Sequence, residues 1–186
     1  MIFDSLIAFI IRTRFQFTGR EQACRQAEAR RGFYLDLASK LKPEQASLPI
    51  RVPRMVGVQE EMRNWSFYML LEHNAIVNRS ITSITQSLAE RKEPTGHGAI
   101  DPKKDVLPSP NPGTEQIEAF NASIDAHLKT VSKLSRLKGS KTKPHPIFGP
   151  FDAHCWHCMF AFHLQVHAKQ AKRIFQESVS DGNRSP

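Results

Sequence analysis

Apolar residues recur at three- and four-residue spacing over most of the chain, the spacing of helices with one buried face. Gly19 and three proline- or glycine-rich stretches, 43–53, 93–113 and 139–150, interrupt this pattern. No stretch alternates polar and apolar residues convincingly, as a half-buried strand would. The pattern therefore predicts an all-α fold.

Four helical regions are expected between these breaks. Their bounds are Phe3–Leu41 with an interruption at Thr18–Gly19, Gln59–Ala89, Thr114–Leu137 and Phe151–Ser178. Thr114 and Asp152 are the candidate N-caps of the last two regions. We expect residues 1–179 to form a single four-helix bundle domain and residues 180–186 to form a frayed polar tail.

The connection between the second and third helices is long. About twenty residues separate them, and five prolines lie between Glu93 and Pro112. A hairpin between antiparallel neighbours needs fewer residues, so we expect a crossover along the bundle and an up-up-down-down topology.

Composition agrees with one globular domain, since the 186 residues are 40% hydrophobic and 24% charged. No stretch has eighteen uncharged apolar residues, so no membrane span is expected. The apolar run from Ile2 to Ile11 has Asp4 in front and lacks a small-residue cleavage site, so we interpret it as an amphipathic helix that is retained. Three cysteines are too few for a disulfide scaffold, and we expect a cytoplasmic protein.

The net charge of +8 is concentrated in part between Lys129 and Lys143, a window without Asp or Glu. Such a patch attracts nucleic acid or a small anionic substrate. Aromatic residues do not interleave the patch as in a single-strand binder, which argues against nucleic acid as a partner and favours a solvated basic surface.

Two of the eight histidines, His163 and His167, are four residues apart in the fourth helical region. This spacing places them about 40° apart around the axis and one turn above each other, so that both imidazoles can reach one ion. The same face contains Trp156 and Phe160, so both rings should point into the bundle. Two imidazoles on an apolar face are difficult to satisfy without a shared metal ion.

His73 is the third candidate ligand, on the predicted inner face of the second helix with Met69 and Ile76. Three imidazoles leave coordination positions open for water or substrate, which is typical of catalytic sites. The neighbouring Glu72 should point away, by about 100°. No Asp or Glu of the final helix lies near the ligands, so no general base is assigned.

The remaining histidines are interpreted differently. By angle, His127 of the third helix is the one plausible fourth group, although a satisfied core histidine is the favoured interpretation. His157 is expected at best to support or flank the site, and His154 is excluded because it faces the opposite way from His163. His97 and His145 lie in predicted loops, where a surface position is the default.

Cys155 and Cys158 form a CxxC motif near the start of the fourth helix. This motif supports redox chemistry where the thiol pKa is depressed, usually in a βαβ fold. The chain lacks that pattern and has no second CxxC at zinc-finger spacing, so packing is the favoured interpretation.

The chain resembles the DinB/YfiT-like superfamily of metalloenzymes. The resemblance extends over residues Pro49 to Phe175, and its motifs are Ile50–Pro53, Asn64–Ser66 with Leu71–His73, His145–Gly149, and His163–His167. It implies a four-helix bundle with a long crossover and one divalent metal, often nickel or zinc, on His73, His163 and His167. It also implies a homodimer.

Family members of known activity include thiol-dependent transferases and isomerases. The resemblance therefore implies a transferase, isomerase or hydrolase in which the metal activates a thiol or water. It would act on a small molecule, with a low-molecular-weight thiol as the expected cosubstrate. Iron or copper also suits imidazole ligands. The alternative is a non-catalytic metal-binding bundle that acts as a stress-related or partner-binding module.

Overall fold

The computed structural model describes residues 2–93 and 105–182. Its six α-helices are α1 (Ile2–Phe17), α2 (Arg20–Ser39), α3 (Pro43–Ser47), α4 (Phe67–Ala89), α5 (Glu115–Lys133) and α6 (Ala153–Gly182). A short 3₁₀ helix covers Glu60–Arg63, and the described strands are β1 (Ile50–Arg51), β2 (Asn64–Trp65), β3 (Lys143–His145) and β4 (Gly149–Phe151). The strands form two small antiparallel pairs, β1 with β2 and β3 with β4. The all-α prediction is confirmed, with these pairs as local additions.

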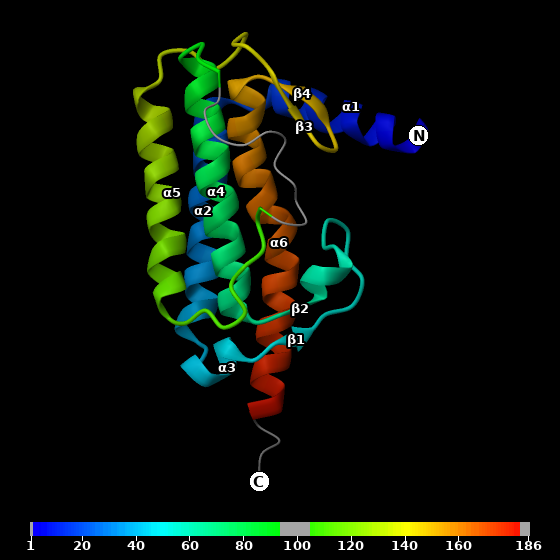
Figure 1. The fold of residues 1–186 in the computed structure, drawn as a ribbon, viewed down its shortest axis with the longest axis vertical. Helices are drawn as coiled ribbons and strands as arrows, with labels where there is room; N and C mark the ends of the chain where they lie inside the picture. Colours follow the sequence, from blue (N-terminus) through cyan, green and yellow to red (C-terminus); the bar gives the residue numbers. More distant parts are fainter. Residues whose placement is uncertain (1, 94–104, 183–186) are drawn as a thin grey trace.

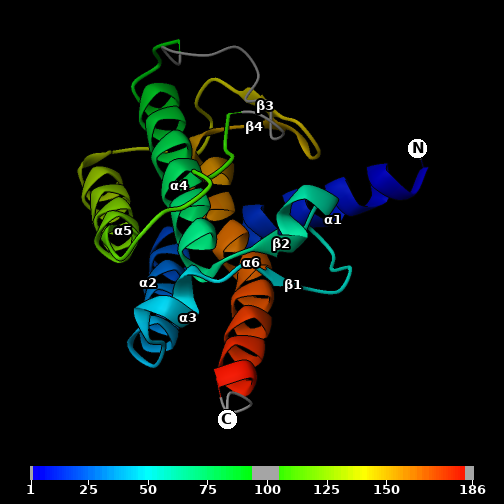
Figure 2. The same cartoon turned by 60° about the horizontal axis from the view of Figure 1, so that its bottom comes forward.

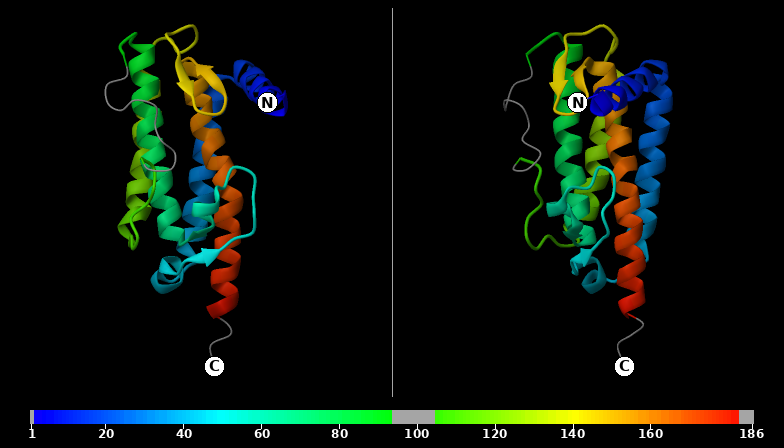
Figure 3. Two further views of the ribbon diagram at one scale, coloured as in Figure 1. Left: turned by 45° about the vertical axis from the view of Figure 1, so that its right-hand side comes forward. Right: turned by 90° about the vertical axis from the view of Figure 1, so that its right-hand side faces the viewer.

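Helices α2, α4, α5 and α6 lie side by side and form a four-helix bundle (Figures 1 and 3). α2 and α6 run in one direction, and α4 and α5 run in the opposite direction (Figure 1). The predicted crossover between the second and third bundle helices is therefore present. The predicted order of directions is wrong, because α3 and the β1–β2 pair reverse the chain between α2 and α4, which gives up-down-down-up.

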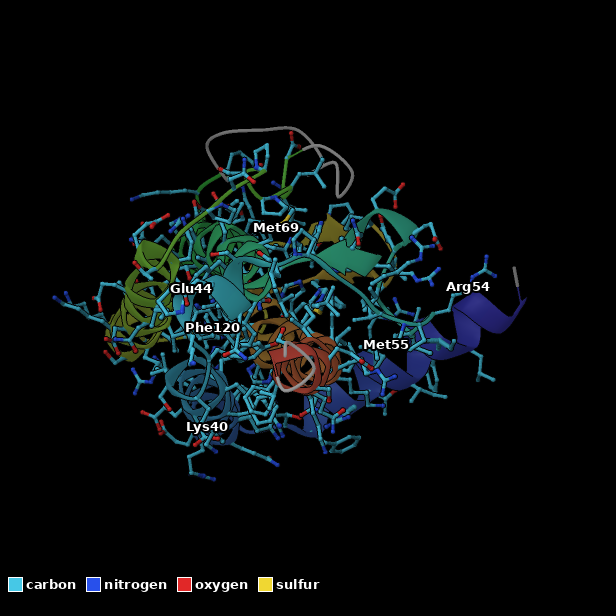
Figure 4. The ribbon with its side chains drawn as sticks, turned by 90° about the horizontal axis from the view of Figure 1, so that it is seen from below. Lys40, Glu44, Arg54, Met55, Met69 and Phe120 are labelled. Carbon is cyan, nitrogen blue, oxygen red and sulfur yellow. The ribbon has the colours of Figure 1, made fainter. Side chains whose placement is uncertain are left out.

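The core of the bundle is aromatic and aliphatic. Figure 4, seen along the bundle from below, shows Phe120 of α5 among the helices. Its ring centroid lies 5.1 Å from that of Tyr34 of α2, and both side chains are fully buried. The Tyr34 hydroxyl donates to the carbonyl of Leu164 on α6 at 3.0 Å, which satisfies the polar end of this buried ring.

The helix boundaries follow local capping. α4 begins at Phe67 rather than at the predicted Gln59, because the Ser66 hydroxyl accepts from the Met69 amide at 3.1 Å. Asp152 caps α6 as predicted, since its carboxylate accepts from the Cys155 amide at 2.8 Å. The Thr114 side chain makes no such bond.

The other ends also differ from the prediction. α5 ends at Lys133, four residues before the predicted Leu137, and the Arg20 guanidinium donates to the Val131 carbonyl in its last turn. α6 continues to Gly182, beyond the predicted Ser178, and so includes the first residues of the expected tail. The chain breaks between α1 and α2 at Thr18–Gly19, as predicted.

α1 projects from one end of the bundle (Figure 2). Phe15 anchors its C-terminal end, with its ring centroid 5.7 Å from that of Phe151 and 5.8 Å from that of Phe162. In contrast, Leu6, Phe9 and Phe17 are 53%, 60% and 84% exposed. Within the described part of the chain, no helix has the length and apolar character that a membrane crossing requires.

Candidate metal centre

His73 of α4 and His163 and His167 of α6 meet in the interior of the bundle. Their ring centroids are 5.3 Å apart for His73–His163, 4.9 Å for His73–His167 and 4.6 Å for His163–His167. One nitrogen from each imidazole lies within 4.8 Å of the other two, so the cluster could hold a metal ion. The helical spacing on α6 and the antiparallel approach of α4 produce this convergence.

The protein orients the His73 ring through the chain that follows α4. The His73 Nδ1–H donates to the Val106 carbonyl at 2.7 Å, which leaves the lone pair on Nε2 free to face a metal. Glu72 points away from the cluster, as predicted, and its carboxylate accepts from the amide and the hydroxyl of Ser109, each at 2.8 Å. Two neighbouring residues of α4, Glu72 and His73, therefore both bind the segment that contains Val106 and Ser109.

His167 is oriented by Gln170, one turn further along α6. The Gln170 amide nitrogen donates to the Met62 carbonyl at 2.7 Å, so the Gln170 oxygen must be the atom that faces His167. That oxygen lies 2.9 Å from His167 Nδ1, which therefore carries the proton. The lone pair on His167 Nε2 is again the free one, and the arrangement matches the outer shell of histidine metal sites.

Two nitrogen atoms of the cluster lack a hydrogen-bond partner among the described residues. His73 Nε2 and His163 Nδ1 are both buried and unpaired. Leaving a buried nitrogen unpaired costs free energy, on the order of 1–3 kcal/mol per group. A metal ion bound to the cluster would remove this cost, so the residues fit a divalent cation.

The three imidazoles are held in the neutral form that metals bind. Burial, followed by the proximity of His167, lowers the pKa of His73 to about 3. Burial lowers the pKa of His167 to about 4 and also lowers the pKa of His163 well below its ordinary value. No proton has to leave the cluster at neutral pH before a metal binds.

A pocket with a volume of about 260 Å³ opens beside the three histidines. Apolar side chains from α4 and α6, among them Val77, Ile81 and Met159, form most of its lining. The β3–β4 hairpin contributes a further part of the lining. Among the described residues, those that line it include neither Asp nor Glu. The histidine cluster therefore faces an accessible, mainly apolar space whose described lining offers no acidic fourth ligand.

Gly57 allows the chain before α4 to approach the pocket closely. Its φ is +82°, and a Cβ at this position would lie 2.4 Å from Cγ1 of Val166 on α6. Only glycine adopts this conformation readily and leaves room for that contact. The turn at Gly57 thus contributes to the pocket wall next to His163 and His167.

His145 was expected at the surface, and the structure corrects this expectation. It lies in β3, it is half-buried, and it lines the pocket. Its ring stacks on Phe148 with centroids 4.8 Å apart and also packs against Trp156 at 5.4 Å. The proline- and glycine-rich sequence around it gave no helical face, so its direction could not be predicted. His97 lies outside the described residues.

His127 and His157 form a separate buried pair. His127 Nε2 lies 2.9 Å from His157 Nδ1, and His127 Nδ1 lies 2.9 Å from the Thr82 hydroxyl. His127 is therefore a satisfied core histidine, as favoured, and not a fourth group at the cluster. His157, which was expected at best to support or flank the site, contacts His127 instead of the cluster. His154 is occupied elsewhere, with Nε2 3.0 Å from the Phe15 carbonyl.

The CxxC cysteines do not have the environment of a redox pair. Cys155 and Cys158 are buried, and burial raises the pKa of each thiol to about 12. A redox-active thiol needs a depressed pKa instead. The structure therefore agrees with the packing interpretation.

Comparison with known proteins identifies the fold. No family model matches the chain, and no curated protein matches it. The crystal structure of TT2238, described as a four-helix bundle protein, is similar with a TM-score of 0.60 and 22% sequence identity. The match covers 83% of this chain and 99% of that chain. The chain is thus a four-helix bundle protein with a three-histidine cluster that could bind a metal.

Proposed function

We propose that this protein is a divalent-metal-dependent enzyme of the DinB-like type, in which His73, His163 and His167 hold one metal ion. The observation that supports this most strongly is the convergence of three neutral imidazoles at an open apolar pocket. The bundle and its crossover agree with the family that the sequence resembles. Nickel or zinc is the expected metal, and iron also suits these ligands.

The metal would supply Lewis acidity, lowering the pKa of a bound thiol or water toward neutrality. The chain's own residues prepare the site for this chemistry. Val106 and Gln170 fix the tautomers of His73 and His167, and mainly apolar side chains surround the space beside them. A thiol-dependent transferase or isomerase reaction on a small molecule is the proposed class.

The non-catalytic alternative is less well supported. A structural metal site is usually closed by a fourth protein ligand. Among the described residues, the group of candidate ligands contains three histidines only, and a pocket opens beside them. A substrate needs open space next to the metal, and a purely structural site has none, so the pocket favours the enzyme.

We also propose a homodimer. This rests on the family resemblance and on the exposed apolar side chains of α1, which a second copy of the chain would cover.

The test is a calorimetric titration of chelator-treated protein with zinc and with nickel. Wild type should bind one ion per chain, and His163→Ala should lose stoichiometric binding. His127→Gln is the control, because His127 is a buried histidine that lies outside the cluster. Circular dichroism checks that each variant is folded. A folded His163→Ala variant that still binds one ion per chain would sink the proposal.

A further inference from the structure

The β3–β4 hairpin holds the His145 imidazole in one tautomer. The backbone amides of Ile147 and Phe148 lie 3.1 Å and 3.3 Å from His145 Nδ1, and an amide can only donate. Nδ1 must therefore be the acceptor, so in the neutral ring the proton resides on Nε2. Burial keeps the ring neutral, because it lowers the pKa of His145 to about 4.

The packing around His145 determines which edge of the ring remains available. The Nδ1 edge of the ring faces the backbone of the β3–β4 hairpin. The rings of Phe148 and Trp156 pack against the His145 imidazole. Nε2 has no hydrogen-bond partner among the described residues, and it is not one of the fully buried unpaired atoms. Since His145 lines the pocket, the Nε2–H edge is the one that a ligand can reach.

The composition of the pocket indicates what such a ligand would be. Its described walls are mainly apolar, and Lys143, two residues before His145, is the one Lys or Arg among the described lining residues. None of the described lining residues is an Asp or Glu that would compete for these donors. The hairpin side therefore contributes His145 and Lys143, and the remaining described walls offer mainly apolar surface.

We propose that His145 binds an oxygen atom of the pocket's ligand through Nε2–H, and that this ligand combines an apolar body with an anionic oxygen group. The inference deepens the proposed function and rests on it in taking this pocket as the substrate site. The hairpin amides act as positioning groups, because they make His145 a donor rather than a base. The three imidazoles of the proposed metal site would differ from His145, because each would turn a nitrogen lone pair, and not an N–H group, toward the metal ion.

The first experiment measures the tautomer. Long-range ¹H–¹⁵N correlation spectra of the metal-free protein, with His145 assigned through His145→Gln, should show a protonated Nε2 and an unprotonated Nδ1 at neutral pH. A protonated Nδ1 would overturn the inference. This measurement needs no metal, so it is independent of whether the proposed metal site is real.

The second experiment measures ligand binding with benzoate, which joins an apolar ring to a carboxylate. Calorimetry should show saturable binding to the wild-type protein. His145→Phe keeps the aromatic stacking but lacks the donor, and its affinity should fall about tenfold, the loss expected for one hydrogen bond to a charged group. His145→Gln has an amide N–H in a similar position and should stay within about threefold of wild type.

Ser83→Ala is the control, because Ser83 is exposed on α4 and is not among the described residues that line the pocket, so the benzoate affinity should stay unchanged. Equal affinity of wild type and His145→Phe, or no saturable binding by wild type, would overturn the inference. Each variant is also titrated with zinc. Retained metal binding in His145→Phe supports a ligand-binding role, whereas lost metal binding would make His145 a metal ligand and contradict the proposal.

Discussion

At the scale of single residues, the three imidazoles differ in what holds them. His73 is oriented by a backbone carbonyl and His167 by a side-chain amide, whereas His163 Nδ1 has no partner among the described residues. A ligand that is already oriented loses less freedom when it binds a metal, so these neighbours should influence metal affinity without touching the ion.

Gln170→Leu tests this influence. Leucine has a similar volume but cannot accept from His167 Nδ1, so we expect the metal affinity to fall about 10- to 100-fold while the stoichiometry stays at one. Competition with a chromophoric chelator measures the affinity. Gln165→Leu on the same helix is the control, since Gln165 lines a different pocket. An unchanged affinity in Gln170→Leu would argue against a metal on His167.

Buried neutral histidines should also make the stability of the metal-free protein depend on pH. The folded-state pKa of His157 is about 4, and burial lowers that of His127 as well, whereas an unfolded histidine titrates near 6.5. Between these values the unfolded chain binds protons that the folded chain excludes. The stability is therefore fully present above about pH 6.5 and is lost as the pH falls toward 4.

Urea unfolding at pH 7.5 and at pH 5.5 measures this loss. Each such histidine should lower the free energy of unfolding by about 1.4 kcal/mol at pH 5.5. His157→Gln should show a smaller difference between the two pH values than wild type. Equal stability of the wild-type protein at both pH values would mean that these histidines are not buried in neutral form.

At the scale of elements, the start of α4 determines where His73 lies. Ser66 ends the extended segment β2 and caps the helix, and His73 follows two turns later. Helical periodicity predicted that His73 faces inward, but it placed the helix start eight residues too early. Apolar spacing does not distinguish a 3₁₀ turn and a strand from a first helical turn, whereas the serine cap does.

Ser66→Ala should therefore destabilise the protein by about 1 kcal/mol, because the Met69 amide loses its acceptor. Urea unfolding measures the change. Ser83→Ala, at an exposed position in the same helix, should cost no stability because alanine favours helix. Equal effects of the two substitutions would show that the cap is unimportant.

The sequence predicted the convergence of the three histidines better than their surroundings. The i, i+4 spacing of His163 and His167 and the inward face of His73 follow from helix geometry alone. Val106, Gln170 and His145 could not be assigned, because their roles depend on where a crossover, a helix neighbour and a hairpin meet in space. Helical angles also placed His127 on the inner face correctly, but could not show that it meets His157 rather than the cluster.

At the scale of the whole molecule, α1 stands out for the apolar side chains that it leaves exposed. Leu6, Phe9 and Phe17 expose apolar surface that a dimer would bury. Sedimentation should show wild-type dimers, and Phe9→Asp should shift them toward monomers. Val56→Ser, which changes a 98% exposed side chain that does not belong to α1, is the control. A monomeric wild type, or a dimer unaffected by Phe9→Asp, would contradict the proposed interface.

The central claim is that one metal ion binds to His73, His163 and His167 with an open position toward the pocket. An anomalous-difference map from crystals of the zinc-loaded protein tests it most directly. We expect one peak at about 2.0–2.1 Å from a nitrogen of each of the three imidazoles, with water or a ligand completing the coordination. A peak elsewhere in the chain, or a fourth side chain that closes the site, would contradict it.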